Sequence, residues 1–328
     1  MVLTSANKTI VDSLWSLCKT VAIILLLATP VKVAALCETW SRHPETAVFN
    51  PSFASEVSGI AVSRSYDDRL YFVNDGPGDP YFYVSDWNAG NIQAVRLRDF
   101  DASNSDVEDI SVGPCNADRA CLFIADIGDN HHTRQSAQIL VVAELGHFGQ
   151  STRTDTVIRF SYPDGPHNAE AMAVHANGDI YVVTKEGSFS GNVSFPARVY
   201  TLKRMQWESG NAQDLHIMEF VTELDLPGLA LPYSVGFAPV ATAMDISSDG
   251  SRFLVLTYEL AFEFAVDLAN TTSAFGPELI RGEHYAPIHV KVLPQQEAIA
   301  YLSGDKGFLY TTELRYGEVE LIRYSCER

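Results

Sequence analysis

Carboxylate and amide side chains recur at fixed places in this sequence of 328 residues. Three glutamates each open a short apolar segment of similar pattern, and the turn Asp126-Ile-Gly-Asp-Asn130 adds further oxygen donors. Ca²⁺ binds about 6 to 8 oxygen ligands, which carboxylates, amide carbonyls and water supply. The pattern therefore predicts a calcium site in which these side chains meet. The predicted ligands are Glu108, Glu170, Glu297, Asp126, Asp129 and Asn130.

A second interpretation of the same residues needs no metal. Carboxylates that converge on one axis repel one another unless something compensates their charge. A glutamate at the start of a strand can accept hydrogen bonds from a neighbouring backbone, and Lys185 can neutralise one carboxylate. In the turn, Gly128 permits a positive φ, and Asp129 and Asn130 favour tight turns. Metal binding and internal bracing therefore both stay open.

No common catalytic motif accompanies these carboxylates. The chain holds no Gly-x-Ser-x-Gly, no His-Glu-x-x-His and no glycine loop of the kind that binds phosphate. The sequence therefore names no catalytic residue. We expect a binding module for a small ligand, a glycan or a protein, with a cation near the entrance of a central tunnel. The alternative is a calcium-dependent hydrolase, in which the metal polarises an oxygen of an ester, lactone or phosphoester.

A two-strand unit recurs along the chain and is the framework that must position these side chains. Each unit begins with a polar residue, a small or acidic residue, Ile or Met, and a mostly small residue. A second strand rich in Val, Leu, Phe and Tyr follows after a turn. Repeats of four short strands at this spacing predict a β-propeller. The unit cores are residues 58–61, 108–111, 170–173, 242–245 and 297–300.

The strand count predicts an all-β domain of five blades over residues 36–328, without helices. The fifth unit lacks a fourth strand, and a strand at residues 46–49 can supply it, which closes the ring and removes exposed sheet edges. A sixth blade would need an unrecognised unit in residues 226–240 or in the N-terminal region. Third strands are expected at residues 81–85, 138–144, 197–203, 261–267 and 319–325, and fourth strands at 92–98, 156–162, 216–223 and 288–293.

The first 35 residues are expected to be a signal peptide. Basic residues precede the apolar run 21–28, and Val33-Ala34-Ala35 fits a signal-peptidase site. An uncleaved membrane anchor is the alternative, but Pro30 and Lys32 interrupt a run that is shorter than the roughly 20 residues needed to span a bilayer. Cleavage would give a secreted protein without a stable membrane span.

Four cysteines would remain after such cleavage, and an even number in an oxidising compartment predicts two disulfides. Cys115 and Cys121 flank a short polar loop between two strands, so they can pair locally. Cys37 and Cys326 are left, and their pairing would join the start of the domain to its end.

The net charge of −18 argues against a nucleic-acid partner, whose backbone attracts Lys and Arg. It favours cations or basic partners, although an acidic soluble surface also explains it. We expect a monomer. Asn192 and Asn270 begin Asn-x-Ser/Thr patterns and are predicted glycosylation sites.

The segments Glu108-Asp-Ile110, Asp126 to Asn130, Asn168-Ala-Glu-Ala171 and Gln296-Glu-Ala-Ile299 resemble a family of secreted, mostly bacterial propellers without an assigned activity. The resemblance covers residues 57–313 and implies a propeller. Members often carry Trp where Val107 stands and Arg where Leu256 stands. More distantly, the chain is similar to the phytase, lactonase and phosphotriesterase propellers, which implies calcium in the tunnel and ester hydrolysis.

Overall fold

The computed structural model describes residues 35–116, 119–188, 193–210, 214–228, 239–270, 279–313 and 317–327. The predicted signal segment, apart from Ala35, and the predicted glycosylation site Asn192 lie outside the described residues. The account below concerns the compact unit Ala34–Arg328 by itself.

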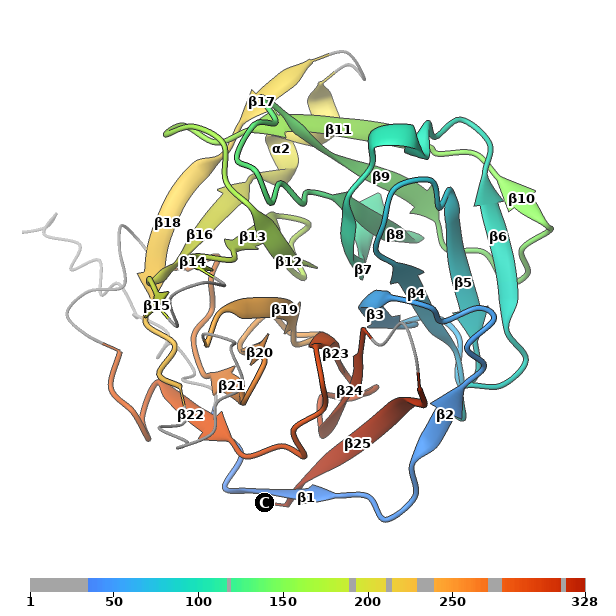
Figure 1. Ribbon diagram of the computed structural model, residues 1–328. Coiled ribbons are helices and arrows are strands. Elements are labelled where there is room, and N and C mark those ends of the chain that lie inside the picture. Colours follow the sequence, from blue (N-terminus) through green and yellow to red (C-terminus); the bar gives the residue numbers. More distant parts are fainter. Residues whose placement is uncertain are drawn as a thin grey trace, which may run out of the picture. The chain divides into compact units, whose positions relative to one another are not determined.

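The described residues of this unit form five sheets of mainly antiparallel strands arranged as the blades of a β-propeller, as predicted (Figure 1), and a small two-stranded sheet. Val, Ile, Phe and Tyr fill the strands, because branched and aromatic side chains pack well on a pleated surface. Blades 1 to 4 comprise β3 (Val57–Val62), β4 (Leu70–Asn74), β5 (Tyr81–Ser85) and β6 (Gln93–Leu97); β7 (Val107–Asn116), β8 (Arg119–Asp126), β9 (Ala137–Ala143) and β11 (Thr156–Ser161); β12 (Ala169–Val174), β13 (Ile180–Thr184), β16 (Ala197–Leu202) and β18 (Glu219–Leu224); and β19 (Ala241–Ile246), β20 (Phe253–Thr257), β21 (Ala261–Phe264) and β22 (Tyr285–Ile288).

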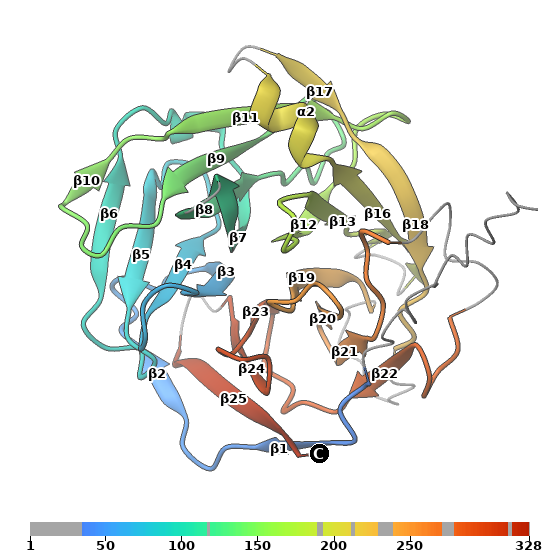
Figure 2. The ribbon, with the colours of Figure 1, turned by 180° about the vertical axis from the view of Figure 1, so that it is seen from behind.

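Blade 5 is built from both ends of the described chain. It comprises β23 (Gln296–Tyr301), β24 (Gly307–Thr312) and β25 (Val319–Glu327), and the N-terminal β1 (Thr39–Arg42) and β2 (Ala47–Phe49) both pair antiparallel with β25. Figures 1 and 2 show β1 beside β25 at the rim of the ring. The ring closure predicted from the sequence is therefore confirmed, with its closing strand split in two.

Two disulfides pair the cysteines as predicted. Cys37 and Cys326 have a Cα separation of 5.7 Å, and Cys115 and Cys121 one of 5.6 Å. The backbone N–H of Cys37 also donates a hydrogen bond of 2.8 Å to Oε2 of Glu263 in blade 4. The start of the described chain is therefore tied to two blades.

The inner strands β3, β7, β12, β19 and β23 contact one another in a closed ring around the axis. Small residues permit this approach: a Cβ on Gly59 would lie 2.6 Å from Cα of Asp109. Polar side chains brace the inner strands across the gap. The Asp109 carboxylate accepts the N–H of Met172 at 2.8 Å, and the Asp245 carboxylate accepts that of Tyr301 at 2.8 Å.

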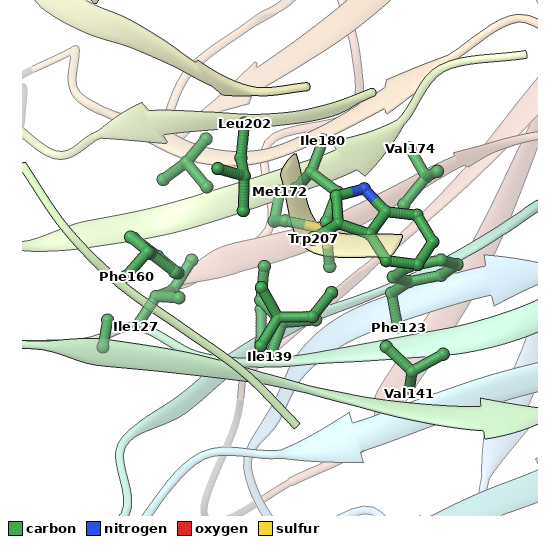
Figure 3. Close-up of a cluster of buried hydrophobic side chains, with 14 of the residues drawn as sticks. Phe123, Ile127, Ile139, Val141, Phe160, Met172, Val174, Ile180, Leu202 and Trp207 are labelled. Atoms are coloured by element: carbon green, nitrogen blue, oxygen red, sulfur yellow. The ribbon is translucent and has the colours of Figure 1, made fainter. Parts of the chain in front are cut away.

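Apolar side chains fill the space between neighbouring blades. In the cluster between blades 2 and 3, Trp207 packs edge-on against Phe123, with ring centroids 5.8 Å apart (Figure 3). Trp207 belongs to a short helix, α2 (Arg204–Ser209), although no helix was expected. The straight side chains of this segment have good helix propensity, and Gln206 Oε1 accepts the N–H of Lys203 at 2.8 Å. Burial of Trp207 then holds the turn in place.

Two predicted fourth strands are shifted. In blade 4 the fourth strand is β22, because residues after Ile288 leave the sheet edge and Leu293 packs in the cluster between blades 4 and 5. In blade 3 the predicted strand is divided. Its first part, β17 (Leu215–Ile217), pairs in parallel with β11 of blade 2, and β18 completes blade 3. Other short elements are η1 (Ala102–Asn104), β10 (Ser151–Thr152), β14 (Gly187–Ser188) and β15 (Val193–Ser194).

Candidate functional site

A cavity of about 460 Å³ lies where the inner strands begin, and we call it the axial cavity. All five blades contribute to it. In an antiparallel pair the end of the second strand lies beside the start of the first, so the residues after β4, β13, β20 and β24 join those at the starts of the inner strands. The lining residues are Glu56, Asp75, Glu108, Asn130, Glu170, Lys185, Tyr258, Gln295, Glu297 and Glu313.

One half of the axial cavity contains its own cation. Nζ of Lys185 lies 2.5 Å from Oε1 of Glu170, 2.8 Å from the Tyr258 hydroxyl and 3.7 Å from Oε1 of Glu297. The Tyr258 hydroxyl also donates a hydrogen bond to Glu297. We call Glu170, Lys185, Tyr258 and Glu297 the lysine half.

Burial shifts the acid–base properties of the lysine half. It raises the pKa of Glu170 to about 7, against the attraction of Lys185. It raises the pKa of Glu297 to about 8, helped by the neighbouring Glu313 carboxyl. Burial works against the charge of Lys185, but the Glu170 and Glu297 carboxylates prevail and raise the pKa of its ammonium.

The other half of the axial cavity holds Asp75 and Glu108, which form a carboxylate triad with Asp106, a residue that does not line the cavity. Each of the three offers one oxygen within 4.8 Å of the others. Asp75 follows β4, and Asp106 and Glu108 stand at the start of β7. Burial and the neighbouring Asp106 raise the pKa of Asp75 to about 7. Burial, Glu170 and Asp75 raise the pKa of Glu108 well above its usual range. Glu108 is only 5% exposed, and no described residue donates a hydrogen bond to its carboxylate.

Gly128 makes room for this triad. A Cβ at this position would lie 2.3 Å from Oε1 of Glu108 and 2.5 Å from Oδ2 of Asp106. Gly128 does not adopt the positive φ that a glycine permits, because it is not among the described residues with that conformation. The residue is glycine because two carboxylates lie against its Cα.

The predicted turn ligands Asp126 and Asp129 do not line the axial cavity. Asp126 accepts the N–H of Asp106 at 2.9 Å and pairs with Arg134 at 2.9 Å. Asp129 accepts the backbone N–H groups of Thr133 at 2.9 Å and Arg134 at 2.8 Å. Both carboxylates therefore brace the turn that follows β8.

Four of the six predicted ligands do meet in the axial cavity: Glu108, Glu170, Glu297 and Asn130. Asn130 is held there by Asn168, whose Nδ2 donates to Asn130 Oδ1 at 3.2 Å. Sequence reasoning missed Asp75, Asp106 and Glu313. A signal for Asp75 and Glu313 was present, since each is a carboxylate directly after a second strand.

The second predicted glycosylation site, Asn270, is exposed, and its amide donates a hydrogen bond to Asp267. Within the described ranges, no helix has the length and apolar character needed to span a membrane.

Comparisons with known proteins give only distant likenesses. No protein-family model and no curated protein sequence matches the chain. Among solved structures, it is similar to the Pan2 WD40 domain of Neurospora crassa, at 8% identity and a TM-score of 0.34, over 83% of this chain and 63% of that one. It therefore spans less than two thirds of the length of that neighbour.

Two further neighbours are similarly distant. YCF48 bound to D1 peptide matches 87% of this chain and 68% of that one, at 9% identity and a TM-score of 0.36. Hydrazine synthase of Kuenenia stuttgartiensis matches 83% of this chain and 72% of that one, at 12% identity and a TM-score of 0.42. No function follows from likenesses this weak.

Proposed function

We propose that this protein is a binding propeller whose axial cavity takes up a positively charged ligand. The observation that carries the proposal is the charge of the cavity wall, where six of the ten lining residues are acidic and one, Lys185, is a lysine. Like charges at such spacing disfavour one another's ionised form, and a bound cation relieves that cost. Burial is the main cause of the raised pKa values of Asp75 and Glu297, and the neighbouring carboxyl groups of Asp106 and Glu313 add to it.

The size of the axial cavity agrees with a small ligand. Its volume of about 460 Å³ lies within the range of about 300–1,000 Å³ that is usual for small-molecule sites. The ligand is therefore a metal ion with its bound water, or a compact organic cation such as a polyamine.

Calorimetric titration of the full secreted chain with calcium chloride and, separately, with spermidine tests this proposal. Binding of either ligand that weakens in Glu108→Gln supports it. Glu219→Gln serves as the control, because this exposed side chain lies on the outer strand β18. Heat changes that are absent with both ligands, or that Glu219→Gln reduces as much as Glu108→Gln, would contradict the proposal.

We also propose that the protein is a secreted monomer and is related to the secreted propellers that its sequence resembles. The two disulfides support secretion, because such bonds persist in oxidising compartments. N-terminal sequencing of protein from culture medium tests it, and a mature chain that begins at Leu36 is expected. Retention of residues 1–35 in the membrane fraction would instead favour an anchor.

Hydrolysis is a second candidate function, and the lysine half favours it. Glu170 and Glu297 have pKa values of about 7 and 8, so each can give or take a proton near neutral pH. No serine, cysteine or histidine lines the described cavity, so a bound metal would have to supply an activated water. A screen of aryl esters, lactones and phosphoesters with and without Ca²⁺ tests this function, and turnover lost in Glu170→Gln would support it.

A further inference from the structure

We infer that Asp75, Asp106 and Glu108 form a site for a single divalent cation of the calcium type. This inference rests on the proposed function and narrows it, because it names the ligand class and one half of the axial cavity. It also replaces the ligand set expected from the sequence, of which only Glu108 is retained.

The triad has the dimensions of a shared cation site. Ca²⁺ lies about 2.3–2.6 Å from each oxygen ligand, so two oxygens on the same ion are at most about 5 Å apart. One oxygen from each of Asp75, Asp106 and Glu108 lies within 4.8 Å of the others. The three carboxylates can therefore reach one ion with small side-chain adjustments and no movement of the strands.

Glu108 provides the independent sign of a ligand. Its side chain is 5% exposed and faces the axial cavity, yet no described residue donates a hydrogen bond to it. A buried charge without a partner is costly, and in proteins such groups are normally paired, hydrogen-bonded or bound to a metal. Gly128 adds a second sign, because its missing side chain leaves the space in which Glu108 and Asp106 approach each other.

The remaining charges around the cavity already have partners. Lys185 occupies the lysine half through Glu170, and Arg134 pairs with Asp126 at 2.9 Å. Arg134 also attracts the Asp106 carboxylate, but the described ion pairs include none between these two residues. An external cation would therefore meet, at the triad, carboxylates that form no ion pair with a described lysine or arginine.

The triad also suits calcium better than magnesium. Its members come from the end of β4 and the start of β7, and the three carboxylates provide only part of a coordination shell. Ca²⁺ tolerates irregular geometry, whereas Mg²⁺ demands a near-octahedral shell and loses its water reluctantly. Three carboxylates leave several coordination positions for water or for an anionic group of a second ligand in the cavity.

Four variants test the site, and each removes one carboxylate from the axial cavity or, at Asp106, from the triad beside it: Asp106→Asn, Glu108→Gln, Glu297→Gln and Glu313→Gln. Calcium affinity is measured by calorimetry on chelator-treated full-length protein. We expect Asp106→Asn and Glu108→Gln to lose affinity by about tenfold or more, because each removes a ligand. Glu297→Gln and Glu313→Gln should change the calcium affinity by less than about threefold, because these side chains are not ligands and affect the ion only through long-range electrostatics.

The outcomes separate this inference from the proposed function. Equal losses of calcium affinity in all four variants would mean that the overall negative charge of the cavity binds the ion, which overturns the triad and leaves the proposed function intact. Binding of spermidine without binding of calcium would likewise overturn the triad and leave the proposed function intact. Binding of neither ligand would overturn both.

A measurement on the unmodified protein tests the site even if the variants fail to fold. Tb³⁺ replaces Ca²⁺ in oxygen sites, and its luminescence decay in H₂O and D₂O reports how many water molecules it retains. A partly dehydrated ion that calcium displaces supports the triad. An ion with its full water shell overturns it.

Discussion

Nζ of Lys185 lies 2.5 Å from Oε1 of Glu170, so an ammonium group at the end of β13 neutralises a carboxylate at the start of β12. The same nitrogen reaches Tyr258 in blade 4 and Glu297 in blade 5. One lysine therefore links three blades at the axis. It also divides the axial cavity into a half with an internal cation and a half without one.

Lys185→Met should destabilise the protein by about 3 kcal/mol, because it leaves the buried Glu170 and Glu297 without their counter-charge. Urea unfolding at neutral pH measures the effect. The double variant Lys185→Met/Glu170→Gln should recover part of the lost stability, since it also removes the unpaired carboxylate of Glu170. Calcium should bind more tightly to Lys185→Met than to the wild type, because the cavity becomes more negative. Unchanged stability would show that the lysine half does not brace the ring.

Gly128→Ala should weaken calcium binding and destabilise the protein by about 1–3 kcal/mol, because the new methyl group meets the carboxylates of Glu108 and Asp106. Gly149→Ala is the matched control. A Cβ there would meet only Ser151 O, at 3.9 Å, so little change is expected. Calorimetry and thermal melting measure both variants. Similar behaviour of the two would mean that the space beside Gly128 is not needed.

Removal of the ring-closing disulfide should cost more stability than removal of the local one. Cys37 and Cys326 are 289 residues apart, whereas Cys115 and Cys121 are 6 apart. The chain-entropy model gives about 6 and about 2 kcal/mol for loops of these lengths, and measured losses are often smaller. Unfolding of the two double Cys→Ser variants tests the order. A reversed order would show that β1 and β2 hold the ring closed without the covalent bond.

The propeller could be predicted because its signals are local. The small residues of the inner strands, such as Gly59 and Ala171, repeat at each blade, since every blade meets the same crowding at the axis. The missing fourth strand of blade 5 and the spare cysteines at both ends pointed to the same closure. The edges of blades 3 and 4 were less predictable, because β17 and β22 lie at rims where pairing depends on the neighbouring blade and on loop length.

The candidate site was predicted only in part, because residue type does not say where a carboxylate points. Asp126 and Asp75 both stand at or just after the end of a second strand. Arg134, 8 positions further along the chain, forms an ion pair with Asp126, which therefore stabilises the turn, whereas Asp75 lines the axial cavity. The role of Gly128 was likewise hidden, since a close approach of side chains from another strand leaves no mark on the local sequence.

His167 forms a charged contact that lies apart from the triad. Its Nδ1 lies 3.1 Å from Oε1 of Glu186, and its Nε2 lies 3.1 Å from Oδ1 of Asp164 and 3.0 Å from the Tyr200 hydroxyl. The hydrogen bond with Glu186, followed by that with Asp164, raises the pKa of the imidazole. The contact ties the loop before β12 to the residues after β13.

This contact should make stability depend on pH in a defined window. Because the folded-state pKa of His167 lies above the unfolded value of about 6.5, its stabilisation is complete below that pH and declines as pH rises through the folded pKa. His167→Gln should therefore be less stable than the wild type by about 1 kcal/mol near pH 6, and this difference should shrink by about pH 8.5. Urea midpoints measured across that range test it, with His131→Gln, an exposed turn residue, as control. Stability curves for wild type and His167→Gln that stay parallel across the window would show that folding does not shift the pKa of this imidazole.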